Sequence, residues 1–381
     1  MPNISPEEIF NFLSAMARFD ASDLYLTIGK APTLRGKHGF SQISDIVLSP
    51  ANMREILVAL LNRRQLREFE QHMELNTAVD MKEQGRFRIN VLQQKHSPAI
   101  VIRRIDAQIP KIQNLGLPPI FKDLALERRG LVLITGMTGS GKSTTLASMI
   151  DYRNEISEGH IITIEDPIEF FHEHKKSVIT QREVGVDTKS YAVAMKNTLR
   201  QRPDVILVGE IRDREVMEQA LAISETGHLC LATLHTSNAY QSIERIVNFF
   251  PEEMEQQVRL NLSLNLKGII SQRLLSGRNR KLVPAVEIML NQGLVRELIL
   301  KGEVGKIRDV IGQNTSSGMC TFDQSLEILY KNGEITEETA MINADKPSEM
   351  KIRLRNVKFS GDEDGGGQLS GMDTSIISLN D

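Results

Sequence analysis

The chain has 381 residues, and its 46 Lys and Arg residues against 49 Asp and Glu residues give a formal net charge of -3. This length predicts two domains, and an apolar content of 40% excludes wholesale disorder. Two cysteines exclude a disulfide framework and a four-thiolate zinc site, and the near-neutral charge argues against a dedicated nucleic-acid-binding protein. The low cysteine content favours the reducing cytoplasm, and because no apolar run approaches the ~18 to 20 residues of a membrane span, we expect no direct membrane insertion.

The first 107 residues predict a small α+β domain. Ser5 and Glu8 form the capping box of a first helix, and Pro6 suits its first turn. Alternating apolar residues then predict strands. The expected elements are this helix, a strand near residues 24–28, a second helix over about 50–71, and strands over 86–92 and 99–105.

Residues 108–119 are rich in Pro and Gly and predict a linker or hinge. Residues 120–345 then hold continuous apolar runs separated by helical patterns, which are typical of a parallel sheet covered on both faces. These runs are 131–134, 161–164, 205–208 and 229–232. From about residue 251 we expect mostly helix, including 252–275 and 324–332. Residues 346–381 predict a C-terminal extension, with an acidic and disordered tail from residue 361.

A phosphate-binding loop follows the first of these apolar runs. Residues 136–143 match GxxxxGK[ST], and the helical stretch 144–152 supplies the context that the motif requires. Its glycines let backbone N–H groups face a phosphate chain, Lys142 can reach the β- and γ-phosphates, and the Ser143 hydroxyl can bind Mg²⁺. The residues predicted to bind ATP are Gly136, Thr138, Gly139, Ser140, Gly141, Lys142, Ser143 and Thr144.

Two other apolar runs end in carboxylates, at the edge of an open sheet where ligands bind. Glu165 ends one run and Glu210 ends another, and such groups can orient or deprotonate an attacking water. Gly209 stands where many P-loop enzymes have an aspartate, so Mg²⁺ would rely on Ser143, on waters and on Glu165. The alternative for both glutamates is capping of the helix that follows.

His235 ends a fourth apolar run, where it can hydrogen-bond a γ-phosphate or the attacking water. A lone histidine is more often structural, and the spacing of His228 and His235 matches no zinc pattern. A hydrolase also benefits from arginines that stabilise transition-state charge, sometimes from a neighbouring subunit. The candidates are Arg86, Arg88, Arg103 and Arg104, each of which is otherwise an ordinary surface arginine.

Four stretches in this order resemble the Walker A, Asp box, Walker B and His box of the secretion-type ATPases. They are residues 136–143, 162–169, 204–212 and 226–236. More narrowly, the chain resembles the retraction ATPases of type IV pili, the PilT/PilU family, over about residues 5–340. Further similarity lies at residues 21–24, 85–90 and 270–273, and a glycine before the Walker B glutamate is usual in this family.

The resemblance implies a PAS-like N-terminal domain, a RecA-like P-loop ATPase domain and a homohexameric ring. It implies that Glu210 and Glu165 are the catalytic carboxylates, that His235 acts with them, and that His228 and His235 form the His box. It also implies that arginines such as Arg88 and Arg103 reach a nucleotide across a domain or subunit boundary.

Departures from the family pattern favour its accessory, PilU-like branch over the principal, PilT-like branch. Met137 replaces a proline, His96 lies near the usual position of an arginine, and the retraction signature is present only as residues 293–299. The acidic tail is a further departure, since the principal motor usually ends earlier. The two isolated cysteines exclude the four-cysteine segment of extension and type II secretion motors.

We therefore expect a Mg²⁺-dependent ATPase ring that drives or assists type IV pilus retraction, and hence twitching motility. Its partners would be a principal retraction ATPase and the platform protein of the pilus at the inner membrane. The alternatives are a principal retraction motor, a weakly active nucleotide-binding assembly partner, and a nucleic-acid translocase, which a net charge of -3 disfavours.

Overall fold

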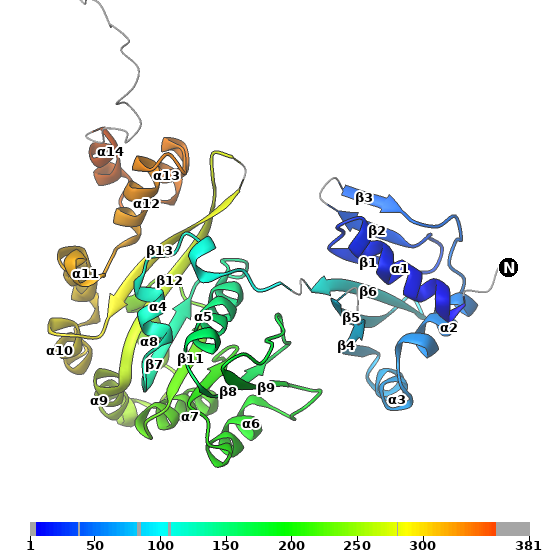
Figure 1. Cartoon of the computed structure of the whole chain (residues 1–381), viewed down its shortest axis with the longest axis horizontal. Helices are drawn as coiled ribbons and strands as arrows, with labels where there is room; N and C mark the ends of the chain where they lie inside the picture. Colours follow the sequence, from blue (N-terminus) through cyan, green and yellow to red (C-terminus); the bar gives the residue numbers. More distant parts are fainter. Residues whose placement is uncertain (1–4, 37–38, 82–84, 106–107, 280, 356–381) are drawn as a thin grey trace, which may run out of the picture.

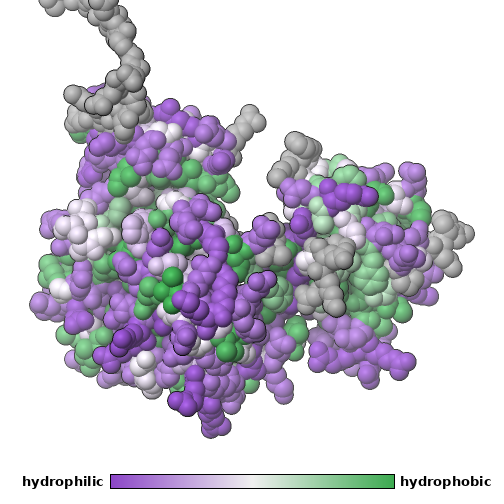
Figure 2. Space-filling view, viewed as in Figure 1, coloured by the Kyte–Doolittle hydropathy of each residue, from purple (hydrophilic) through white to green (hydrophobic). Residues whose placement is uncertain are grey.

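The computed structural model describes residues 5–355, apart from 37–38, 82–84, 106–107 and 280. Two lobes are joined by an extended stretch of chain, and each is built around its own sheet (Figure 1). The face drawn in Figure 2 is mostly hydrophilic, with smaller apolar areas on both lobes. The acidic tail expected from residue 361 lies outside the described residues.

The N-terminal lobe packs three helices against a six-stranded sheet of order β3-β2-β1-β6-β5-β4, in which all neighbouring strands are antiparallel. Its strands are β1 (Asp23–Leu26), β2 (Thr33–Gly36), β3 (Gly39–Gln42), β4 (Glu74–Met81), β5 (Gly85–Gln94) and β6 (Ser97–Ile105). Its helices are α1 (Pro6–Arg18), α2 (Pro50–Leu60) and α3 (Arg63–His72). The expected capping box at Ser5 and Glu8 is present and begins α1.

Strand β5 separates the core of this lobe from an arginine-bearing face. Phe87, Ile89 and Val91 are fully buried in the core. Because side chains alternate along a strand, Arg86 and Arg88 lie on the opposite face. The alternation of apolar residues along this strand thus matches the division between its core face and its arginine-bearing face.

The single helix expected over residues 50–71 is two helices, so that prediction was wrong. α2 ends at Leu60, and α3 begins at Arg63 after its N-cap residue Asn62. The Asn62 side chain accepts from the backbone N–H of Gln65, and the Gln65 side chain accepts from the backbone N–H of Asn62. This capping box ends one helix and starts another within a few residues.

The second lobe holds a seven-stranded sheet of order β13-β12-β7-β11-β10-β8-β9. Its strands are β7 (Gly130–Thr135), β8 (Gly159–Glu165), β9 (Ser177–Glu183), β10 (Val205–Val208), β11 (Leu229–Leu234), β12 (Leu266–Ser276) and β13 (Leu282–Leu290). Neighbouring strands are parallel except β12 and β13. Every residue of β7, β10 and β11 is buried, as the continuous apolar runs predict for strands covered on both faces.

The helices of this lobe surround the sheet and extend beyond it. They are α4 (Ile120–Ala125), α5 (Lys142–Ile156), α6 (Tyr191–Thr198), α7 (Arg214–Glu225), α8 (Ala239–Val247), α9 (Glu255–Asn265), α10 (Leu294–Lys301), α11 (Ile307–Gln313), α12 (Phe322–Lys331), α13 (Glu337–Asn343) and α14 (Pro347–Arg355). Figure 1 places α12, α13 and α14 together beyond one end of β12 and β13, with which they share a separate core around Phe322. None of the helices in the described part of the chain combines the length and the apolar character that crossing a bilayer requires.

The helix expected over residues 252–275 is also wrong, because its second half is a strand. α9 ends at Asn265 and β12 begins at Leu266. The apolar run that includes Ile269 and Ile270 fits a helix and a buried strand equally well by pattern alone. Pairing with β7 on one side and β13 on the other decides in favour of the strand.

Candidate active site

The predicted phosphate-binding loop connects β7 to α5, as the motif requires. Gly141 has a φ of 87°, and a Cβ there would lie 2.7 Å from Nε2 of Gln272, so both the backbone and the space require glycine. Gln272, a buried residue of β12, donates from Nε2 to the Ser140 carbonyl and accepts from the Thr145 hydroxyl. Strand β12 therefore holds the loop in place.

Lys142 lies largely buried within this loop. Its Nζ donates to the carbonyl oxygens of Gly136, at 2.7 Å, and Met137, at 3.0 Å. Burial lowers the pKa of Lys142, and the negative charge of Glu210 acts in the opposite direction. The lysine thus lies close enough to Glu210, which follows β10, to interact with its carboxylate.

Glu210 is held from two sides at the edge of the sheet. Its Oε1 lies 3.3 Å from Nε2 of His235, and its Oε2 accepts from Nε of Arg212 at 2.8 Å. The Arg212 guanidinium also pairs with Asp166 at 3.1 Å. Since Glu165 ends β8, which pairs in parallel with β10, the ends of three strands bring two glutamates and a histidine to one edge.

The Glu165 carboxyl group is largely withdrawn from water. Its Oε1 accepts from the Thr163 hydroxyl at 2.6 Å and from Nε2 of Gln181 at 3.3 Å. Burial raises the pKa of Glu165 to about 7, and these hydrogen bonds limit the rise because they stabilise the ionised form. A carboxyl group with such a pKa can take up and release a proton near neutral pH.

Gly209, directly after β10, lies close to α6 and to the end of β8. A Cβ at this position would lie 2.9 Å from the Tyr191 hydroxyl and 3.2 Å from Cα of Glu165. The aspartate of other P-loop enzymes therefore has no room here. Tyr191, the first residue of α6, instead lines the space beside both glutamates.

One cavity of about 480 Å³ collects these groups. Its walls come from the phosphate-binding loop, from the ends of β8, β10 and β11, and from the segment that follows β8. Of the predicted site residues it is lined by Thr138, Gly139, Gly141, Lys142, Ser143, Thr144, Glu165, Glu210 and His235. Gly136 and Ser140 are buried within the loop itself.

Three predicted site residues lie elsewhere. His228 precedes β11, and His235 follows it, so the six residues of that strand separate the two members of the predicted His box. Arg88 and Arg103 are cross-strand partners on β5 and β6 of the other lobe, and Arg103 pairs with Asp23 at 2.8 Å. Neither arginine lines the cavity of its own chain, so their predicted contact with a nucleotide requires a neighbouring subunit.

A smaller cavity of about 220 Å³ lies beside the start of α5. Its walls combine the linker with the paired strands β12 and β13, and Gly141 and Thr144 line both cavities. The lining is mainly apolar, with one linker amide, and includes Asn114, Leu115, Leu117, Leu274, Leu282 and Pro284. The two cavities thus share the glycine-rich turn as a common wall.

The described residues hold no cluster of three His, Cys, Asp or Glu side chains that could hold a metal ion. A Mg²⁺ ion that arrives with phosphates needs only one or two protein ligands, and these are oxygen atoms. The Ser143 hydroxyl is exposed and lines the same cavity as the Glu165 carboxylate. The residues present therefore fit an ion of this kind.

Three residues of the site were not predicted from the sequence. Arg212 stands two positions after Glu210, which is a local signal that could have been used. Tyr191 and Gln272 belong to α6 and β12, and only the fold brings them to the loop and the glutamates. No pattern along the chain connects residues so far apart.

A phosphate-binding loop that shares a cavity with two glutamates and a histidine defines a P-loop nucleotide hydrolase. The comparison with known families agrees, because residues 54–325 match the family described as Type II/IV secretion system protein. The chain belongs to that family.

Individual relatives narrow the assignment to pilus ATPases. The chain is 46% identical over 351 residues to the type IV pilus ATPase PilU of Pseudomonas aeruginosa, covering 91% of each chain. It is 39% identical over 340 residues to PilT of the same organism, covering 89% of this chain and 99% of that one. It also superposes on the crystal structure of the pilus retraction motor PilT with bound ADP, with a TM-score of 0.85 and 40% identity over 92% of this chain and all of that one. The predicted resemblance to the PilT/PilU family is confirmed.

Proposed function

We propose that this chain is the ATP-hydrolysing subunit of a hexameric motor that assists type IV pilus retraction, in the accessory role of PilU. The observation that carries the proposal is the single cavity in which Lys142, Glu165, Glu210 and His235 meet. Greater identity to PilU than to PilT, 46% against 39%, supports the accessory role. The N-terminal sheet would be the PAS-like domain (residues 1–107), the segment 108–119 the hinge, and residues 120–345 the RecA-like domain.

The loop binds the phosphates, and its geometry orients the nucleotide. In a P-loop the backbone N–H groups and the lysine face the β- and γ-phosphates, which places the γ-phosphate in the larger cavity beside the glutamates. Thr144, the third residue of α5, would then lie nearer the α-phosphate. The adenine base then enters the smaller cavity, where Leu115 and Leu274 offer apolar contacts and Asn114 a polar one.

The two glutamates act on the attacking water in different ways. We assign Glu210 as the residue that orients the water, because His235 and Arg212 hold both of its carboxylate oxygens in fixed positions. Glu165, whose pKa is raised to about 7, is suited to accept the proton that the water loses. His235 lies against Glu210 and is placed to hydrogen-bond the γ-phosphate.

A bound Mg²⁺ would be held by Ser143 and by waters, which leaves Glu165 free to accept the proton, and the ion would supply charge neutralisation on the phosphate oxygens. Lys142 contributes a second positive charge on the same side of the cavity. Arg88 and Arg103 of a neighbouring subunit would add the positive charge that the transition state of phosphoryl transfer requires. A ring in which each N-terminal lobe completes the next subunit's site supplies that arrangement.

The proposed motor would work in the cytoplasm, peripheral to the inner membrane, against the platform protein of the pilus. Its partner would be a principal retraction ATPase of the PilT kind. The proposal predicts that purified protein forms hexamers, and that mixing it with the principal motor raises ATP turnover in a way that depends on Lys142.

The test combines ATP turnover and particle size, measured for the protein alone and with a principal retraction ATPase. Wild-type protein is expected to co-assemble and add turnover, whereas Lys142→Ala is expected to co-assemble without adding any. Equal twitching motility in cells carrying wild type and Lys142→Ala would instead point to an assembly partner that needs no hydrolysis.

A further inference from the structure

Arg86 forms a buried ion pair between the two lobes. It lies on β5 of the N-terminal lobe, and its Nη2 donates to Oε2 of Glu183 at the end of β9, at 2.6 Å. The two side chains are only 10% and 5% exposed. A buried pair of this kind is costly to break, because the partner left behind is a buried charge without compensation.

Glu183 connects this pair to the segment that follows Glu165. The same oxygen, Oε2, accepts from the backbone N–H of Ile168 at 3.1 Å. The Arg86 guanidinium also lies 4.8 Å from the ring centroid of Phe171, within range of a cation–π contact. One arginine of the N-terminal lobe therefore reaches the segment 168–171 at two points, directly at Phe171 and through Glu183 at Ile168.

The same segment forms part of the wall of the nucleotide cavity. Glu169 and Phe170, between the two contact points of Arg86, line that cavity together with Glu165. Gln181, on the same face of β9 as Glu183, donates to Glu165 and to the carbonyl of Phe170. Strand β9 thus holds the segment 168–171 through contacts within its own lobe, and Arg86 holds the same segment from the N-terminal lobe.

We propose that Arg86 is a positioning residue for ATP hydrolysis, which fixes the segment 166–172 and through it the Glu165 carboxylate. The inference rests on the proposed function and adds a coupling between the lobes. Arg88, two residues along the same face of β5, is a candidate for the site of a neighbouring subunit. Strand β5 therefore positions Glu165 of its own chain through Arg86, and it also sets the direction in which Arg88 points. A shift of the N-terminal lobe would then affect two sites at once.

The first test is amide hydrogen exchange on the full-length protein without nucleotide, so that it does not depend on hydrolysis. Arg86→Met is expected to raise the exchange rate of peptides covering residues 166–172 by about tenfold. Arg104→Met is the matched control, because Arg104 on the neighbouring strand pairs with Asp20 inside its own lobe. Unchanged exchange at 166–172 in Arg86→Met, or an equal change in the control, would overturn the proposal.

The second test separates positioning from binding by steady-state kinetics. Arg86→Met is expected to lower kcat by about tenfold while KM for ATP stays within about twofold. Because Arg86→Met alone leaves Glu183 unpaired and can destabilise the fold, the double variant Arg86→Met, Glu183→Gln is measured beside it. Its kcat is expected to be no lower than that of Arg86→Met, since the pair acts as a unit.

The two tests fail in different ways. Faster exchange at 166–172 with wild-type kcat would mean that the ion pair is structural only, and would overturn the positioning role. Absence of ATP turnover in the wild-type protein, both alone and mixed with a principal retraction ATPase, would refute the proposed function, while the exchange comparison would still decide whether Arg86 holds the segment.

Discussion

Gly209 shows how one missing side chain shapes the site. The backbone directly after β10 passes so close to Tyr191 and Glu165 that even a Cβ atom at position 209 would meet the Tyr191 hydroxyl at 2.9 Å. The family resemblance made a glycine expected here, but its physical reason is visible only in the fold. Without a side chain at 209, Glu165 and Glu210 can lie on either side of one cavity.

Gly209→Ala is expected to lower kcat by at least about tenfold, because the added methyl group must displace Tyr191 or the backbone at Glu165. Tyr191→Phe removes the nearest atom, so the double variant is expected to regain part of the lost rate. Steady-state ATP turnover of the two single variants and the double variant gives the comparison. Strictly additive losses of kcat in the double variant would show that the Tyr191 hydroxyl is not the group that a side chain at position 209 would meet.

Glu165 predicts a pH dependence with a defined sign. Its pKa is raised from 4.5 to about 7, so the ionised form that can accept a proton is lost as pH falls through this value. The Thr163 hydroxyl stabilises the ionised form. Thr163→Val is therefore expected to move the acid limb of the kcat–pH profile to higher pH, whereas a limb that stays in place or moves to lower pH would contradict the assignment.

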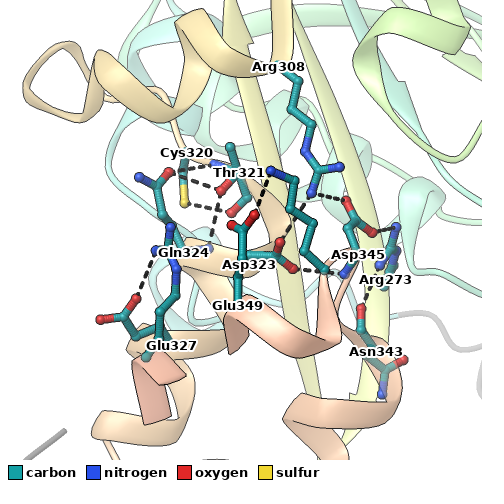
Figure 3. A network of polar contacts seen from close by, with 12 residues as sticks. Arg273, Arg308, Cys320, Thr321, Asp323, Gln324, Glu327, Asn343, Asp345 and Glu349 are labelled. Carbon is teal, nitrogen blue, oxygen red and sulfur yellow. Dashed lines mark hydrogen bonds and ion pairs between the residues drawn. The ribbon is translucent and has the colours of Figure 1, made fainter. Parts of the chain in front are cut away.

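At the scale of elements, β12 connects the phosphate-binding loop with the C-terminal helices. Gln272 points to the loop, and Arg273, the next residue, points to the opposite face. Figure 3 shows Arg273 reaching Asp345 and the Asn343 carbonyl, while Arg308 joins Asp345 to Asp323 on α12. Strand β12, which the sequence pattern predicted to be helix, thus contacts the phosphate-binding loop through Gln272 and the C-terminal helices through Arg273.

Gln272→Ala is expected to weaken ADP binding by about tenfold, because it removes the two hydrogen bonds that hold the loop, at about 0.5–1.5 kcal/mol each. Calorimetric titration with ADP measures this effect. Gln324→Ala serves as the control, since Gln324 caps α12 and bonds to the Gly312 carbonyl away from the loop. The control is expected to lower Tm with unchanged ADP affinity. Equal ADP affinity in Gln272→Ala and wild type would mean that the loop holds its own shape.

The elements that the sequence predicted well are those that a single local signal determines. The buried strands β7, β10 and β11 are continuous apolar runs, and the phosphate-binding loop is a contiguous motif. By contrast, β12 is ambiguous between helix and strand until it pairs with β7. Glu165, Glu210 and His235 could be placed at strand ends from the sequence, whereas the contacts of Arg86, Tyr191 and Gln272 depend on long-range packing and could not.

For the whole molecule, the central feature of our proposal is a site that is divided between two subunits. The cavity holds the loop, the glutamates and His235, but neither Arg88 nor Arg103 lines it. These two arginines are cross-strand neighbours on the N-terminal sheet. By our proposal, a single chain lacks part of the positive charge that phosphoryl transfer requires.

Mixing two inactive variants tests this division directly. Lys142→Ala and Arg88→Ala are each expected to hydrolyse ATP poorly alone. In mixed rings, some sites combine the intact loop of one variant with the intact Arg88 of the other, so ATP turnover is expected to recover. No recovery, despite mixed rings confirmed by native mass spectrometry, would show that Arg88 does not act across subunits.

ATP turnover by Glu210→Gln decides whether this cavity is where the chain hydrolyses ATP, with ADP affinity measured on the same preparation. We predict that turnover falls by about 100-fold or more while ADP affinity stays within about twofold of wild type, because the substitution keeps the shape of the side chain and leaves the loop intact. Turnover at the wild-type rate would show that the chain hydrolyses ATP elsewhere.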